Sequence, residues 1–208
     1  MKSKVAFEAE GMGHPLLPET CIRNDLSLNE RTRFYIVSGS NMAGKSTLIR
    51  AIGLNAILAY SGAPVCADAL SLSLFPICAA TSIQDSLLNG RSKFLEEMYR
   101  LKHALDLTTG AKPVLFLIDE PLNGTNSRDR RVAADAIVAA LIQGGALGVI
   151  STHDLALTEI AARPDLHGLN VHMGSRNSDP MNFDFKVRAG VTEESNGLAI
   201  ARLAAVSV

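Results

Sequence analysis

The sequence lacks the features that mark several classes of protein. Its 208 residues carry a net charge of −1, without the basic excess of an electrostatic nucleic-acid binder. Its three cysteines form no CxxC pair, which argues against a disulfide framework and a cysteine zinc site. No apolar run approaches the roughly 18 residues that a membrane span needs, and the N-terminus has no signal-peptide segment. We therefore expect a reduced, cytoplasmic domain with a hydrophobic core and no membrane partner.

Strands and helices alternate along the middle of the chain. Short apolar runs predict buried strands over 33–37, 114–118 and 147–150, because continuous apolar character suits parallel strands covered on both faces. Segments rich in Leu, Ile and Ala that end at glycines predict helices over 46–60 and 132–141. This alternation is typical of an α/β fold with a mostly parallel central sheet flanked by helices.

Two further segments have clear periodicity. After Ser92, apolar residues recur at i, i+4, i+7 and i+11, which predicts an amphipathic helix. From Met181 to Val187 apolar and polar residues alternate, the pattern of an antiparallel strand with one wet face. The parallel sheet is therefore expected to carry an antiparallel β annex towards the end of the chain.

A phosphate-binding pattern joins the first of these strands to the first helix. Residues 39–46, GSNMAGKS, match G-x-x-x-x-G-K-[ST] in full. The glycines let successive backbone N–H groups point at phosphate oxygens, and the positive end of the following helix adds to the attraction. Lys45 is expected to reach the β- and γ-phosphates and Ser46 to ligate Mg²⁺. A glycine-rich turn that merely links strand to helix is the alternative.

Polar residues follow two of the other predicted strands. Asp119 and Glu120 end the strand over 114–118, and His153 follows the strand over 147–150. Ligands of open α/β sheets bind at this carboxyl edge. Asp119 is therefore a candidate Mg²⁺ ligand, Glu120 a candidate base for the attacking water, and His153 a candidate γ-phosphate contact.

Taken together, these motifs resemble the ATPase domain of the MutS family, which is related to the ABC-type ATPases. The resemblance covers nearly the whole chain. It is carried by a series of ordered segments, namely GHPL at 13–16, NDL at 24–26, SGSNMAGKST at 38–47, the signature-like 85–98, LIDEPLNGTNS at 117–127, STH at 151–153, and the closing elements NVH at 170–172 and NGLA at 196–199.

The resemblance implies a P-loop NTPase fold and Mg²⁺-dependent ATP hydrolysis at a dimer interface, with a second copy or another MutS-like ATPase domain as partner. It implies that Ser92 reaches the partner's γ-phosphate in trans, that Asn41 lies near the attacking water, and that adenine lies against Ile22 and His172. We expect ATP or ADP to bind to the residues of the phosphate-binding loop and the start of the following helix, namely Gly39, Ser40, Asn41, Met42, Ala43, Gly44, Lys45, Ser46 and Thr47.

Several departures from the family pattern accompany the resemblance. Cys21 stands where the family often has an aromatic residue against adenine. No segment resembles the mismatch-reading domain, the lever and clamp helices or the C-terminal helix-turn-helix. We therefore expect residues 1–208 to form one MutS-like ATPase domain that meets DNA through regions of a larger parent protein. Arg128, Arg130 and Arg131 cluster after the Gly-Thr motif and are interpreted as a solvated surface or a dimer contact.

Two alternatives to a hydrolysing repair ATPase stay open. One is a nucleotide-dependent dimerisation switch with little hydrolysis, in which ATP changes the shape of the protein. The other is an ABC-type transport ATPase subunit, which Leu88-Asn-Gly-Arg-Ser92 disfavours because it is a poor match to that family's Ser-Gly-Gly signature.

Overall fold

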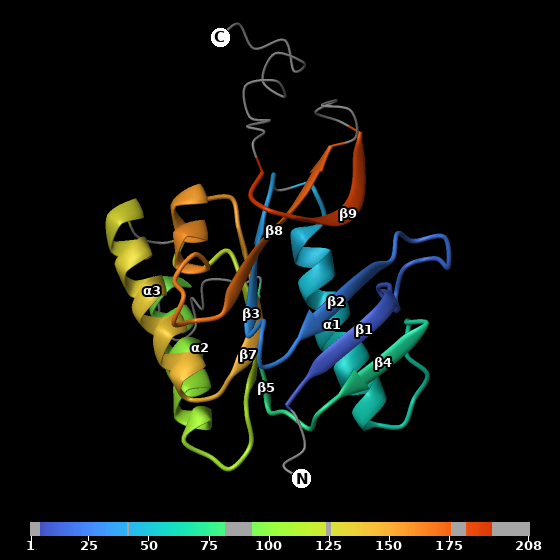
Figure 1. Ribbon diagram of the computed structural model, residues 1–208, viewed down its shortest axis with the longest axis horizontal. Coiled ribbons are helices and arrows are strands. Elements are labelled where there is room, and N and C mark those ends of the chain that lie inside the picture. The colour runs from blue at the N-terminus through green and yellow to red at the C-terminus, as the bar shows by residue number, and fades with distance from the viewer. Residues whose placement is uncertain (1–4, 41, 82–92, 124–125, 176–181, 193–208) are drawn as a thin grey trace, which may run out of the picture.

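A six-stranded mixed sheet forms the centre of the protein (Figure 1). The computed structural model describes residues 5–40, 42–81, 93–123, 126–175 and 182–192. Five parallel strands are followed at one edge by an antiparallel strand. In spatial order the strands are β5 (Ile77–Ala80), β6 (Leu115–Asp119), β7 (Leu147–Thr152), β3 (Phe34–Ser38), β8 (Gly168–Ser175) and β9 (Phe183–Ala189).

A second sheet of three antiparallel strands lies beside the first and was not predicted. Its order is β2 (Asn24–Leu28), β1 (Phe7–Met12) and β4 (Ala69–Leu72). Buried and exposed residues alternate in these strands, as Phe7 and Ala9 do with Glu8 and Glu10, but each strand is only four to six residues long and the pattern is correspondingly brief. The antiparallel part of the fold is therefore larger than expected, because it includes this sheet as well as β9.

The helices cover both faces of the mixed sheet. Figure 1 shows α2 (Lys93–Thr108) and α3 (Ser127–Gln143) on one side, and α1 (Lys45–Tyr60) with the three-stranded sheet on the other. A short 3-10 helix, η2 (Leu155–Ile160), follows β7 and packs on α3. Among the described residues no helix is long and apolar enough to cross a membrane.

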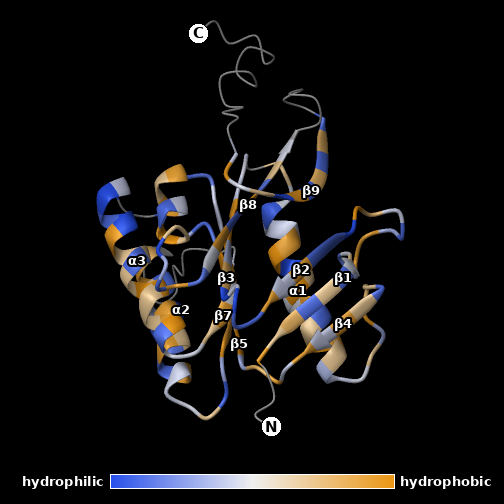
Figure 2. Ribbon diagram, in the orientation of Figure 1, coloured by the Kyte–Doolittle hydropathy of each residue, from blue (hydrophilic) through white to orange (hydrophobic). Residues whose placement is uncertain are grey.

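Alternate side chains of the central strands enter two separate cores. Ile36, Phe116 and Ile118 pack in the core beneath α2 and α3, whereas Val37 and Leu117 pack in the core beneath α1. Both sets are buried, which explains the continuous apolar runs in the sequence and the hydrophobic colouring of these strands in Figure 2.

The predicted helices and parallel strands are confirmed, with shifted ends. Helix α3 begins at Ser127, five residues before the predicted start, because the Asn126 side chain accepts a hydrogen bond from the Asp129 N–H and caps the helix. In β9 the prediction of which residues are solvent-exposed and which are buried is wrong at two positions. Asp184 is buried against Arg188, whereas Phe185, with a φ of 55°, is 43% exposed.

Candidate functional site

The carboxyl ends of three parallel strands bring distant parts of the chain together. Ser38 of β3 is in register with Thr152 of β7, and Asp119 of β6 is in register with Ser151. The residues that directly follow these strands therefore meet at one edge of the sheet. We call five side chains there the charged edge: Lys45, Ser46, Asp119, Glu120 and His153.

The loop from β3 to α1 requires glycine at both ends. A Cβ on Gly39 would lie 2.1 Å from the Met173 carbonyl oxygen, and one on Gly44 would lie 3.0 Å from a ring carbon of Phe185. Both residues also have positive φ. Gly44 precedes α1 and has no side chain to cap it, so the first N–H groups of the helix are available to an anion.

Lys45 is a buried cation directed into its own loop. It is 2% exposed, and its Nζ donates to the carbonyl oxygens of Gly39 at 2.7 Å and Ser40 at 2.9 Å. Its Nζ also lies 3.4 Å from Oε1 of Glu120. Burial lowers the pKa of Lys45, and the charge of Glu120 opposes that shift. The hydroxyl of Ser40 is buried with no hydrogen-bond partner among the described residues, so this loop contains an unused polar atom.

Oxygen atoms suited to a hard cation lie next to this lysine. Ser46 Oγ donates to Asp119 Oδ1 at 3.0 Å, and the Ser151 hydroxyl donates to the same oxygen. Within the described part of the chain no three His, Cys, Asp or Glu residues form a metal-binding group. Mg²⁺ commonly uses one or two protein oxygens and completes its shell with water and phosphate, so Ser46 and Asp119 fit that ion.

Glu120 lies between Lys45 and His153 at the charged edge and contacts both. Its Oε2 lies 2.7 Å from Nδ1 of His153 and accepts a bond from the His153 backbone N–H at 3.3 Å. Its own backbone N–H donates to the Ser151 carbonyl at 3.1 Å. Its φ of 54° is unusual for a residue with a side chain, and such backbone positions concentrate at functional sites.

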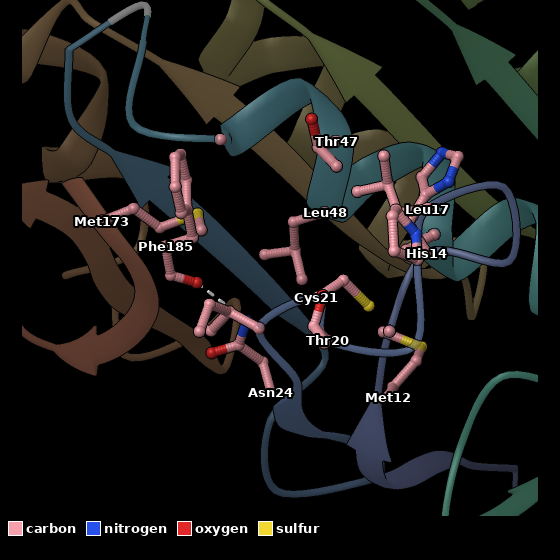
Figure 3. Close-up of a pocket in the computed structure, with 15 residues that line it drawn as sticks. Met12, His14, Leu17, Thr20, Cys21, Asn24, Thr47, Leu48, Met173 and Phe185 are labelled. Atoms are coloured by element: carbon pink, nitrogen blue, oxygen red, sulfur yellow. Dashed lines mark hydrogen bonds between the residues drawn. The ribbon is translucent and has the colours of Figure 1, made fainter.

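An apolar pocket of about 340 Å³ lies beside the charged edge (Figure 3). Its walls come from the loop before β2, from the first turns of α1 and from β8 and β9. Figure 3 shows Phe185 beside Met173, across from Leu48 and the residues before β2. Most of its lining is apolar or sulfur-containing, including Met12, Leu17, Cys21, Ile22, Leu48, Met173 and Phe185.

The structure locates most of the residues predicted to hold adenine and phosphate. Ile22 and Thr47 line the apolar pocket, whereas His172 is not among the described lining residues and its Nδ1 lies 3.3 Å from the Gly190 carbonyl oxygen. In the loop Ala43 is buried and Met42 is 55% exposed. Asn41 and Ser92 lie outside the described residues.

Phe185 was missed as a candidate site residue. The alternation of β9 suggested that it packs in the core, whereas its positive φ turns it into the apolar pocket. Asn24 holds this stretch of β9 in place, since its side chain donates to the Phe185 carbonyl at 3.0 Å and accepts from the Val187 N–H at 2.8 Å. No local pattern in the sequence links positions 24 and 185.

Comparisons with known proteins identify the family of this chain. Residues 35–208 match the family described as MutS domain V. The chain belongs to the MutS family. It is 32% identical over 209 residues to the DNA mismatch repair protein MutS of Thermotoga petrophila, an alignment of 98% of this chain and 26% of that protein.

Other members of the MutS family match to a similar extent. The DNA mismatch repair protein MutS of Lactobacillus delbrueckii subsp. bulgaricus is 36% identical over 186 residues, 88% of this chain and 21% of that protein. The DNA mismatch repair protein MutS 2 of Halobacterium salinarum is 34% identical over 204 residues, 95% and 23% of the two chains. The chain thus spans about a quarter of the length of these relatives.

Proposed function

We propose that this chain is a P-loop NTPase of the ABC/MutS type that binds ATP with Mg²⁺ and hydrolyses it as the motor of a MutS-like DNA mismatch repair protein. The observation that carries the proposal is the charged edge. Strands β3, β6 and β7 bring four features to one place. These are the loop before α1 with its available N–H groups, Lys45, the Ser46 and Asp119 oxygens that suit Mg²⁺, and the Glu120–His153 pair. Family membership supports the same function.

The triphosphate fits the loop between β3 and α1. The N–H groups at the start of α1 and the Ser40 hydroxyl can donate to phosphate oxygens, and Lys45 can exchange its two carbonyl partners for phosphate. Ser46 and Asp119 would hold Mg²⁺, which supplies charge stabilisation at the phosphates when bound.

The apolar pocket fits the nucleoside half of ATP. Gly44, Thr47 and Leu48 belong to both the start of α1 and the pocket wall, so a ligand with phosphates on the loop extends directly into the pocket. Phe185 supplies an aromatic face for the adenine ring, the kind of surface that Cys21 cannot provide.

Hydrolysis then requires a water in line with the γ-phosphorus. Glu120 takes a proton from the water as the new P–O bond forms, and the bond to the oxygen shared with the β-phosphate breaks to leave ADP and phosphate. Since Glu120 is paired with Lys45, movement of Lys45 onto the phosphates frees Oε1 of Glu120 for this role.

A nucleotide-dependent switch is the second candidate. It is favoured by the charges around Glu120, whose Oε1 forms an ion pair with Lys45 at 3.4 Å without a hydrogen bond and whose Oε2 lies 2.7 Å from Nδ1 of His153, because ATP binding must rearrange these contacts before hydrolysis. The family assignment favours both candidates over a transport ATPase subunit. Contact with DNA is assigned to other regions of a longer protein.

Turnover of Mg-ATP across a wide range of protein concentration separates the two. A site completed by Ser92 of a second copy, or of another MutS-like domain, predicts that turnover per molecule rises with concentration. Tight ATP binding with turnover that is flat and near zero would support the switch, and absence of both would contradict the whole proposal.

A further inference from the structure

Arg130 differs from its neighbours in the basic cluster after β6. It lies in the first turn of α3, where the sequence suggested a solvated surface or a dimer contact. Its side chain is only 14% exposed, whereas that of the adjacent Arg131 is 48% exposed. Both arginines pair with acidic residues around η2, Arg130 with Asp154 and Arg131 with Glu159, so the two differ chiefly in burial and in what else they touch.

The Arg130 guanidinium joins the segments that follow two strands of the charged edge. Its Nε donates to the Leu122 carbonyl at 3.2 Å, and its Nη1 lies 3.4 Å from Oδ2 of Asp154. Leu122 follows Glu120 by two residues, and Asp154 directly follows His153. One side chain therefore connects the turn that carries Glu120 to the segment that carries His153.

The turn that Arg130 contacts is held in an uncommon conformation. Leu122 is fully buried and has a φ of 56°. Its N–H donates at 2.7 Å to Glu97 of α2, a residue that is itself 3% exposed. With its carbonyl bound by Arg130, both peptide groups of Leu122 are paired, which is what allows a buried residue to keep a left-handed backbone.

The Asp154 segment is fixed in a similar way. Oδ1 of Asp154 accepts a bond from the Ala156 N–H at 3.1 Å and caps η2, while Oδ2 faces Arg130. The two carboxylate oxygens of Asp154 thus have separate tasks. A substitution that keeps the cap and removes the charge can test the second task alone.

We propose that Arg130 is a positioning residue that holds the Glu120 turn and the His153 segment together, so that His153 Nδ1 stays within hydrogen-bond distance of Glu120. The inference rests on the proposed ATP hydrolysis at the charged edge. It requires arginine, because a planar guanidinium presents separate N–H donors in fixed directions, whereas a lysine ammonium is a single point on a flexible chain.

The test compares Arg130→Met with the matched control Arg131→Met. Loss of Arg130 should lower kcat for ATP about tenfold and change KM less than twofold, because the contacts position Glu120 and His153 rather than the bound nucleotide. The control should stay within twofold of the unmodified chain in both constants. Arg130→Lys should not restore kcat.

Asp154→Asn keeps a side-chain oxygen for the η2 cap and removes the charge that faces Arg130. It should lower kcat in the same direction as Arg130→Met. The double variant should lose much less than the product of the two single losses, because residues that act through one contact are not additive. Melting temperature and circular dichroism establish that each variant is folded under the assay conditions.

A readout without turnover separates this inference from the proposed function. The ring ¹⁵N resonances of His153 should move in Arg130→Met and keep their positions in Arg131→Met. If turnover is absent but these resonances respond as expected, the proposed hydrolysis fails and the positioning role stands. Equal effects of the two methionine variants, or a kcat loss that only follows the folded fraction, would overturn the positioning role.

Discussion

The charged edge and the apolar pocket meet at the start of α1 and differ in how their side chains are held. At the charged edge the functional side chains pair with one another, as Lys45 does with Glu120 and Ser46 with Asp119. In the apolar pocket Phe185 is positioned through its backbone, by Asn24, and the residue is 43% exposed. The charged edge therefore depends on ion pairs and hydrogen bonds between side chains, whereas the apolar pocket depends on apolar contact.

This difference predicts different failures in the two regions. Substitutions at the charged edge remove an interaction and leave a partner unpaired, so their effects should be large. Substitutions in the apolar pocket remove contact area alone, so their effects should be moderate and confined to the base of the ligand.

The largest effect is expected for Lys45→Met. Two charge-assisted hydrogen bonds to phosphate, at about 2 kcal/mol each, correspond to an affinity loss on the order of a thousandfold. Calorimetric titration with Mg-ATP measures this loss. Lys102→Met is the matched control, because Lys102 forms an exposed pair with Asp106 on α2 and should leave the affinity unchanged. A loss below fivefold for Lys45→Met would contradict the assignment of the phosphates.

Glu120→Gln should separate binding from chemistry. The amide cannot accept the proton of the attacking water, so turnover should fall about a hundredfold while Mg-ATP still binds. Steady-state turnover and a binding titration on the same sample provide the two numbers. Glu159→Gln, which alters the exposed pair with Arg131, is the control and should change neither. Equal turnover in the two variants would remove Glu120 from the mechanism.

Phe185→Ala tests the apolar pocket. Loss of one aromatic stacking surface, worth about 1–1.5 kcal/mol, should weaken ATP binding about tenfold. Binding of inorganic tripolyphosphate should not change, because that ligand occupies the charged edge alone. Phe185→Tyr keeps the ring and should bind ATP normally. Parallel losses for ATP and tripolyphosphate would show that Phe185 acts on the loop and not on the base.

The smallest expected effect is a pH dependence set by Lys45. Burial lowers the pKa of Lys45 below the ordinary lysine value of 10.5, so Lys45 loses its charge at a lower pH than an exposed lysine does. ATP affinity should therefore decline on the alkaline side below pH 10.5. Glu120 raises this pKa, so in Glu120→Gln the decline should begin at lower pH. Titrations across the alkaline range measure both curves, and identical curves would show that Lys45 and Glu120 are not coupled.

The charged edge could be predicted from sequence because Lys45 and Ser46 belong to the phosphate-binding pattern, and the other three residues end or directly follow buried apolar runs. Asp119 ends β6 and His153 follows β7, so the strand pattern alone places them at one edge. The predicted helices and parallel strands were also confirmed. The burial of a covered strand or of an amphipathic helix is visible as a hydrophobic pattern within a short stretch of sequence.

The apolar pocket could not be predicted in this way. It depends on packing between segments far apart in the chain, such as Asn24 against Phe185. Its aromatic surface also depends on a positive φ that breaks the alternation of β9, a feature that periodicity does not reveal. The three-stranded sheet was missed because its strands, although they alternate, are only four to six residues long and pair across long stretches of the chain, as β1 does with β4. Long-range packing, rather than local pattern, decided each of these features.

Photoaffinity labelling with 2-azido-ATP tests the central claim most directly, because one experiment reports on both regions. The account predicts that the label is found in residues 12–24 or beside Phe185, and that inorganic tripolyphosphate competes with it for the charged edge. Labelling elsewhere in the chain, or labelling that tripolyphosphate does not reduce, would contradict a single nucleotide site formed by the charged edge and the apolar pocket.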